Sequence, residues 1–157
     1  MSAVPVQYDT FVIERRLASS PARVFVAFAD QKKKARWFGC VDGWEVAEHT
    51  LDFRVGGRER TSGGPKGEWV SQYDAIYHDI VPNERIVSSY DMRIDGKLIS
   101  VSLATVELKP EGAATRLTFT EQGAYLDAFD NAEEREEGTR QLFDALARVL
   151  ERQTATA

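Results

Sequence analysis

Hydrophobic and polar residues alternate along much of the chain, with the period of two that is typical of strands buried on one face. In the segment 8–17, Phe11, Ile13 and Leu17 fall on one side of such a strand, while Val12 and Glu14 fall on the other. The same kind of pattern predicts further strands at 44–51, 53–61, 68–80, 84–94, 98–109 and 114–122. The middle of the chain is therefore expected to form an antiparallel sheet of about six or seven strands.

Turn residues divide these strands. Asp95-Gly96 separates two alternating runs and predicts a hairpin in which both residues take positive φ. Gly56-Gly57 predicts a bulge or a tight bend. The glycine-rich stretch 63–67 predicts a loop.

Two short helices are predicted after the first strand. Ser20 and Pro21 mark the start of the first one, because serine caps free N–H groups and proline suits the first helical position. The second is expected over 31–37 and ends at Gly39. The basic run Lys32-Lys33-Lys34 within it is interpreted as a solvated face.

A long helix is predicted over 132–152. Its acidic start and basic end suit the helix macrodipole, and Leu142, Leu146 and Val149 form an apolar stripe at helical spacing. This helix is the largest element able to cover the apolar face of the sheet. The fold class is therefore α+β, and a curved sheet closed by one helix tends to enclose a pocket.

Composition narrows the classes of function. The chain has 157 residues, 43% of them hydrophobic, which suits a single domain over 1–157 with loose ends at 1–5 and 154–157. The net charge of −5 argues against nucleic-acid binding. The single cysteine, Cys40, excludes an intrachain disulfide and suits a reducing compartment. No membrane span or signal peptide is apparent, so we expect a cytoplasmic protein, and a homodimer is compatible with the sequence.

Four segments carry a family resemblance. They are Ser-Pro-Ala-Arg-Val-Phe at 20–25, Arg-Trp-Phe at 36–38, Arg-Val-Gly-Gly at 54–57, and the segment 80–87. With this order of elements, the chain resembles the START-like, helix-grip superfamily (SRPBCC). The most similar branch is that of homologues of the activator of the heat-shock chaperone ATPase, which is related to polyketide cyclases. Relatives often carry a Gly-Trp pair at the start of the final helix, where this chain has Gly138-Thr139. The resemblance therefore implies a helix-grip fold with a roomier or more polar pocket near that turn.

Strand alternation and helical spacing give the candidate site. The residues expected to line a ligand cavity are Trp37, Phe38, Ile86, Ser88, Tyr90, Met92, Leu117, Phe119, Glu121, Leu142, Leu146 and Val149. Glu121 stands out, because a carboxylate on an apolar face needs a partner or a raised pKa. Either Arg93 or Arg116 holds it ionised at the rim, or it serves as an acid or anchor inside the pocket.

Few residues suggest catalysis. The candidates are Glu121, Tyr90 and His78, each as an acid–base group. Cys40 lacks a nearby activating base in the sequence. The two histidines show no metal-binding spacing, so we expect neither a metal nor a cofactor.

These features favour a container over an enzyme. The leading interpretation is a protein that binds a small hydrophobic or amphipathic molecule in a cavity between the sheet and the C-terminal helix. The first alternative is a cyclase- or dehydratase-like enzyme acting on a polyketide-like substrate. The second alternative is a protein-interaction role, such as that of a chaperone ATPase cofactor, which predicts an exposed contiguous patch.

Overall fold

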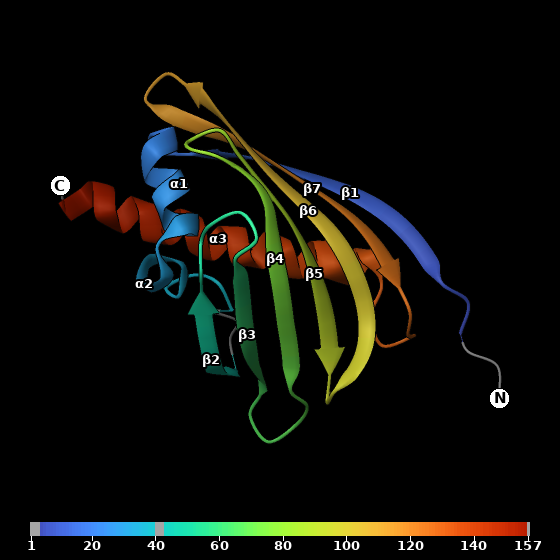
Figure 1. The fold of residues 1–157 in the computed structure, drawn as a ribbon. Helices are drawn as coiled ribbons and strands as arrows, with labels where there is room; N and C mark the ends of the chain where they lie inside the picture. The colour runs from blue at the N-terminus through green and yellow to red at the C-terminus, as the bar shows by residue number, and fades with distance from the viewer. Residues whose placement is uncertain (1–3, 40–42, 157) are drawn as a thin grey trace.

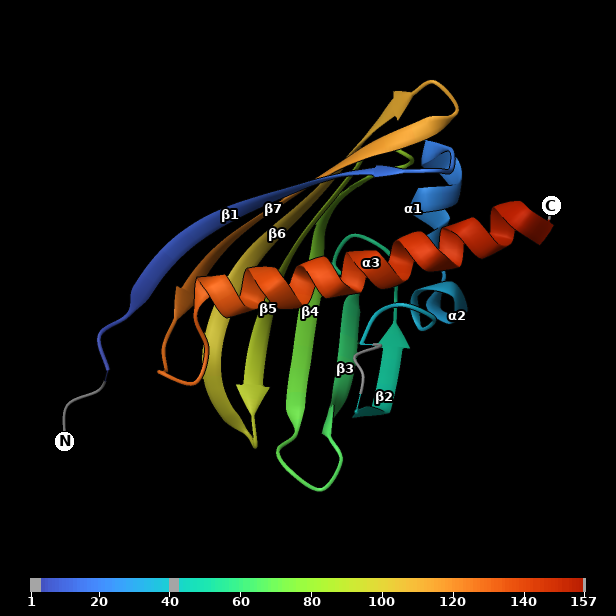
Figure 2. The same ribbon diagram turned by 180° about the vertical axis from the view of Figure 1, so that it is seen from behind.

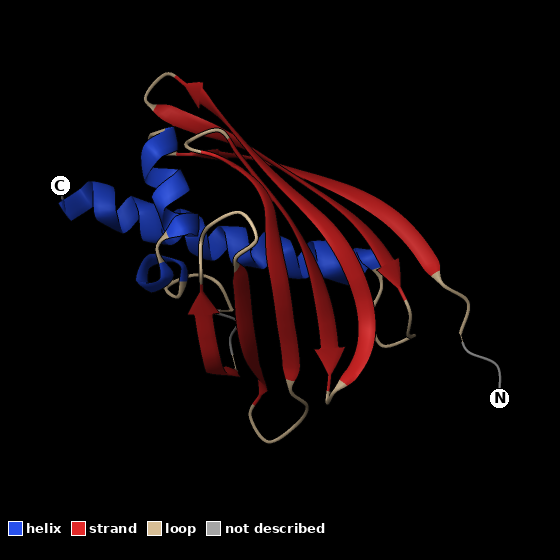
Figure 3. Ribbon diagram, viewed as in Figure 1, coloured by secondary structure: helices blue, strands red, loops and turns tan. Residues whose placement is uncertain are grey.

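The computed structural model of the protein describes residues 4–39 and 43–156 (Figure 1). Seven strands and three helices make up the described chain (Figure 3). In chain order they are β1 (Gln7–Leu17), α1 (Pro21–Ala29), α2 (Gln31–Lys34), β2 (Trp44–Leu51), β3 (Arg58–Pro65), β4 (Ser71–Val81), β5 (Arg85–Ile94), β6 (Lys97–Glu111), β7 (Ala114–Tyr125) and α3 (Ala132–Thr156). This order confirms the predicted α+β class.

The strands form one antiparallel sheet with the order β1-β7-β6-β5-β4-β3-β2. Strands β2 to β7 follow one another as a meander, and β1 adds to the far edge beside β7. The sheet curves, and α3 runs across its concave side, with α1 and α2 near one end (Figures 1 and 2). This is the helix-grip arrangement that the resemblance implied.

Local sequence explains two of the predicted boundaries. Asp95 and Gly96 both take positive φ, at 49° and 83°, and they join β5 to β6 as expected. Ser20 caps α1, because its hydroxyl accepts a hydrogen bond from the Arg23 N–H at 3.3 Å, and Pro21 follows at the first helical position.

The glycine-rich stretch 63–67 is not entirely a loop, which corrects the prediction. Gly63 and Gly64 belong to β3 and pair with Val46 and Glu45 of β2. Both glycines allow close backbone approach, since an added Cβ would lie 2.5 Å from the Glu45 carbonyl oxygen at Gly63. The strand thus extends further along the chain than its composition suggested.

The boundaries of three other elements also differ from the prediction. The predicted bend lies at Gly56, which has a φ of 82°, while an added Cβ at Gly57 would lie 2.1 Å from the Asp52 carbonyl oxygen. Helix α2 ends at Lys34, earlier than predicted. Helix α3 continues to Thr156, so part of the expected loose end 154–157 is helical. In the described part of the chain, no helix has both the length and the apolar character needed to cross a membrane.

Candidate ligand-binding site

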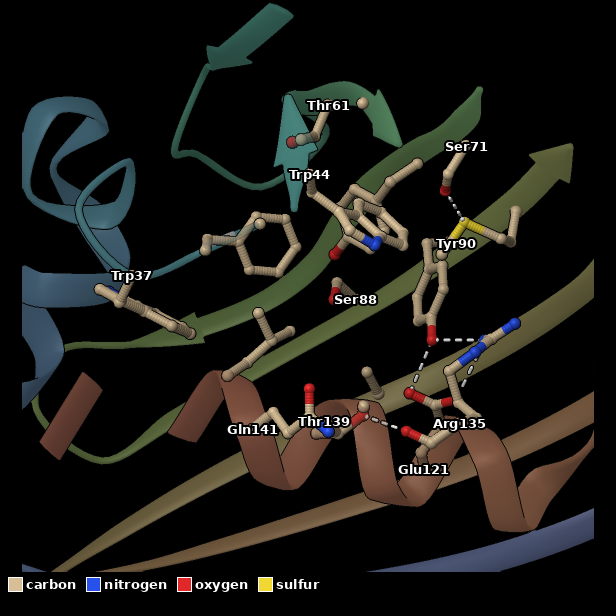
Figure 4. Close-up of a pocket in the computed structure, with 18 of the residues that line it drawn as sticks. Trp37, Trp44, Thr61, Ser71, Ser88, Tyr90, Glu121, Arg135, Thr139 and Gln141 are labelled. Atoms are coloured by element: carbon tan, nitrogen blue, oxygen red, sulfur yellow. Dashed lines mark hydrogen bonds and ion pairs between the residues drawn. The ribbon is translucent and has the colours of Figure 1, made fainter. Parts of the chain in front are cut away.

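A cavity of about 510 Å³ lies between the inner face of the sheet and the first half of α3. Its lining comes from α1, α2, β2 to β7, the segment before α3, and α3 itself (Figure 4). Exposed residues such as Val46 and Phe129 also line it, so the cavity reaches the molecular surface. This volume falls in the range of roughly 300–1,000 Å³ that is usual for small-molecule sites.

Small residues explain why this space is not filled. Ser88 of β5 and Ala104 of β6 pair side by side on the floor of the cavity. Opposite them, α3 presents Gly138 and Thr139, where an added Cβ at Gly138 would meet no atom within 4 Å. A helix that passes over short side chains leaves a void, because neither surface reaches the other. Gly138 and Thr139 therefore open the cavity in the region where many relatives carry tryptophan.

Aromatic rings build much of the wall. The Tyr73 and Tyr90 ring centroids lie 4.6 Å apart, and Phe38 meets Tyr73 edge-on at 5.0 Å. Trp44 and Trp69 also pack edge-on, with centroids 5.2 Å apart. Rings in such contact hold one another in place, so the wall is rigid and offers both ring faces and ring edges to a ligand.

Glu121 is the centre of a buried polar cluster at one end of the cavity. The Tyr90 hydroxyl donates to its Oε1 at 2.8 Å, and Arg135 Nη1 lies 3.4 Å from its Oε2. Arg135 also donates to the Tyr90 hydroxyl at 2.7 Å and to Ser100 at 2.8 Å, and it forms an ion pair with Asp130. Figure 4 shows Glu121, Tyr90 and Arg135 converging beside α3. The cluster links β5, β6 and β7 to the start of α3.

Burial is the main cause of the pKa shifts in this cluster. Burial raises the pKa of Glu121, although the Arg135 charge and the Tyr90 hydrogen bond act to lower it. Burial also raises the pKa of the Tyr90 hydroxyl well above its usual value. Tyr90 therefore stays protonated at neutral pH and remains a donor to Glu121.

A second buried carboxylate, Glu59, lies near the other end of the cavity. Lys34 Nζ, which lines the cavity, donates to Glu59 Oε1 at 2.6 Å. The Tyr77 hydroxyl donates to the same oxygen at 2.7 Å, and His49 Nε2 lies 2.8 Å from Oε2. Burial acts to raise the pKa of Glu59, but the Lys34 charge and the three hydrogen bonds outweigh it and bring the pKa to about 2. This cluster fastens α2 onto β2, β3 and β4.

Most of the residues expected in the cavity lie on its lining, since the strand alternation and helical spacing placed them there. They are Trp37, Phe38, Ile86, Ser88, Tyr90, Met92, Phe119, Glu121 and Leu142. Trp37 is almost completely buried and its ring nitrogen donates to the Ala27 carbonyl oxygen at 3.0 Å. Trp37 therefore borders the cavity from within the protein interior rather than from the surface.

Three expected residues lie elsewhere. Leu117 and Leu146 are both 0% exposed and belong to the solid core, and Val149 packs against that core. The rings of Phe119 and Phe143, 5.3 Å apart, stand between the core and the cavity. The apolar stripe of α3 thus faces two environments: its beginning borders the cavity, and its later part fills the core.

The other catalytic candidates are placed as follows. His78 is exposed and lies outside the lining, with its Nε2 2.7 Å from the Ser89 hydroxyl. Cys40 lies outside the described residues. Among the described residues, no group of His, Cys, Asp and Glu is arranged to hold a metal ion.

Arg135, rather than Arg93 or Arg116, is the partner of Glu121. Arg116 pairs with Glu14 and Glu111, and Arg93 donates to the Gly96 carbonyl oxygen. Strand alternation could not identify this partner, because Arg135 lies on α3 and reaches Glu121 only when that helix docks on the sheet.

Sequence reasoning also missed Glu59 and the role of Lys34. Lys34 was interpreted as part of a solvated face, but it is 5% exposed and paired. One signal was available: Glu59 and Thr61 share a face of a predicted strand, so an inward carboxylate was indicated. Which cation would meet it depended on how the short helix folds back.

Comparison with known proteins agrees with this architecture. The model of the family "Activator of Hsp90 ATPase homolog 1-like protein" matches residues 18–151. A solved protein from Rhizobium loti is 50% identical, over 93% of this chain and 99% of that one, with a TM-score of 0.85. One from Rhizobium leguminosarum is 40% identical, over 94% and 97%, with a TM-score of 0.89. An AHSA1-like protein from Aeromonas hydrophila, 20% identical over 93% and 94%, shares the fold with a TM-score of 0.71. No curated protein matches the chain.

Proposed function

Because this chain belongs to the Activator of Hsp90 ATPase homolog 1-like family, we propose that it uses the family's helix-grip fold to bind a small, mostly apolar molecule between α3 and the sheet. The observation that carries this proposal is the cavity of about 510 Å³ with its aromatic and aliphatic walls. Sites for small molecules are typically concave, mostly apolar and equipped with a few polar groups that orient the ligand. The polar clusters at Glu121 and Glu59 are suited to that orienting role.

Filling the cavity from α3 tests the proposal. Thr139→Trp places a large ring into the space that Gly138 and Thr139 leave open. We expect the wild-type protein to enhance the fluorescence of the neutral apolar probe N-phenyl-1-naphthylamine. The Thr139→Trp variant should bind this probe at least about tenfold more weakly, because ring and probe compete for one volume.

The matched control is Glu137→Trp. Glu137 is exposed on α3 and lies outside the lining, so this variant adds the same ring without entering the cavity. It should bind the probe like the wild type. If wild-type protein does not bind the probe, or if Thr139→Trp binds it equally well with the fold intact by circular dichroism, the container proposal is wrong and a protein-interaction role becomes the leading one.

A cyclase- or dehydratase-like activity is the second candidate, and the Glu121–Tyr90 pair favours it. A carboxyl group with a raised pKa beside a cavity is a candidate for proton transfer. Its oxygens are engaged by Tyr90 and Arg135, so a substrate group would have to displace one of these contacts. Glu121→Gln should then abolish turnover of a polyketide-like substrate while leaving its binding intact. Loss of binding and turnover together would instead assign Glu121 an anchoring role.

A further inference from the structure

On the cavity lining, the buried hydroxyl of Thr61 has no hydrogen-bond partner among the described residues, and the hydroxyls of Tyr73 and Ser88 form no hydrogen bond with another described side chain. Thr61 Oγ1 is fully buried, and Ser88 is only 7% exposed. Two tyrosine hydroxyls of the cavity are already engaged, since Tyr90 donates to Glu121 and Tyr77 donates to Glu59. Leaving a buried hydroxyl unpaired is costly, so Thr61 points to a partner that is not part of the chain, and the Ser88 and Tyr73 hydroxyls on the same lining are available to that partner.

The register of the sheet explains their common direction. Thr61 of β3 lies directly opposite Tyr73 of β4, and Ser88 of β5 lies opposite Tyr77 of β4. Residues paired across neighbouring strands project to the same side, here the concave side below α3. The Ser88 hydroxyl lies in the middle of the cavity, between Thr139 and the aromatic wall (Figure 4). A ligand that fills the cavity would therefore contact the Ser88 hydroxyl with its central part rather than with one end.

The charged groups of the cavity argue against an anionic ligand. Of the two cations that line it, Lys34 is already paired with Glu59, and Arg135 is paired with Asp130 and Glu121. A ligand carboxylate would meet Glu121 and Asp130 without a cation left to compensate it. Burying an uncompensated charge in such a site is strongly unfavourable.

Resting on the proposed function, we propose that the ligand is an uncharged aromatic compound that carries a hydroxyl or carbonyl oxygen, such as a phenol or an aromatic ketone. Ser88 is its principal hydrogen-bond partner, and Tyr73 and Thr61, which pair with each other further along the sheet, offer two more hydroxyls. The aromatic part matches the ring faces of Tyr73, Tyr90 and Trp69 on the lining. A hydroxyl group both donates and accepts, so it serves either kind of oxygen.

A matched series of ligands tests this inference at neutral pH. The series is 2-naphthol, 2-methylnaphthalene and 2-naphthoate, which share one ring system and differ in the substituent, measured by displacement of N-phenyl-1-naphthylamine. We expect 2-naphthol to bind about fivefold more tightly than 2-methylnaphthalene, the effect of about one net hydrogen bond. The ionised 2-naphthoate should bind at least about tenfold more weakly than 2-naphthol.

Two neighbouring serines supply the variant and its control. Ser88→Ala should remove the roughly fivefold advantage of 2-naphthol and leave 2-methylnaphthalene unchanged, without lowering the denaturation midpoint. Ser89→Ala changes the adjacent residue of β5, which points away from the cavity toward His78, and should affect no ligand.

The outcomes separate the two proposals. If 2-methylnaphthalene binds but neither the naphthol preference nor its dependence on Ser88 appears, the inference is wrong and the container proposal stands. Tight binding of 2-naphthoate would also overturn the inference. If no member of the series displaces the probe and the probe itself does not bind, both proposals are wrong.

Discussion

Glu59 and Glu121 lie at the same depth, 0% and 1% exposed, yet the pKa of Glu59 is lowered and the pKa of Glu121 is raised. Glu59 has a dedicated cation, because Lys34 Nζ contacts it at 2.6 Å. Glu121 shares Arg135 with Asp130, and that guanidinium is 3.4 Å away. Desolvation is the same kind of penalty in both places, so the partner decides the outcome.

The two buried glutamates therefore differ in how completely their charge is compensated. The Glu59 cluster is saturated by Lys34, His49 and Tyr77, and it holds α2 against the sheet as a structural fastening. The Glu121 cluster borders the cavity, and burial raises the pKa of its carboxyl group. Two glutamates of equal burial thus differ in pKa because their partners differ.

The largest expected effect comes from removing the dedicated cation. Lys34→Met leaves Glu59 buried without its charge partner and should lower the free energy of unfolding by about 3–5 kcal/mol in urea denaturation. Lys32→Met, at an exposed position of the same helix, should change it by less than about 0.5 kcal/mol. Equal effects of the two variants would mean that the Lys34–Glu59 pair does not stabilise the fold.

The next effect compares the two carboxylates directly. Glu59→Gln leaves Lys34 charged and buried and should cost about 3 kcal/mol, whereas Glu121→Gln should cost less than about 1 kcal/mol, because Arg135 keeps Asp130 as its partner. Both are measured at pH 7 by urea denaturation. If both variants lose the same free energy of unfolding, the two carboxylates stabilise the fold equally, and the contrast in their pKa values has no energetic counterpart.

The two carboxylates should also give stability opposite pH dependences. The pKa of Glu59 falls from an ordinary 4.5 to about 2 on folding, so its contribution is present above pH 4.5 and is lost as the pH drops toward 2. The pKa of Glu121 is raised on folding, so its ionisation destabilises the fold as the pH rises above 4.5. Carboxyl-carbon NMR should show Glu59 titrating near 2 and Glu121 above 4.5, and the reverse order would contradict the assignment.

The local pattern of the sequence was sufficient for most of the architecture. Period-two alternation located the strands, Asp95-Gly96 located a hairpin, and Ser20-Pro21 located a helix start. These features depend on neighbouring residues only, so they can be inferred before the chain is folded. The same alternation oriented Ser88, Tyr90 and Glu121 toward the inner face.

Only the tertiary structure decided how the cavity ends and what charges it carries. Leu146 and Val149 share a helical stripe with Leu142, but the docking of α3 places only Leu142 on the lining. Likewise, Lys34 meets Glu59 and Arg135 meets Glu121 across elements that are separate in sequence. The sequence by itself determines which residues face inward, because facing is a local property of strands and helices. It does not determine which inward residues meet, because that depends on the relative placement of α2, α3 and the curved sheet.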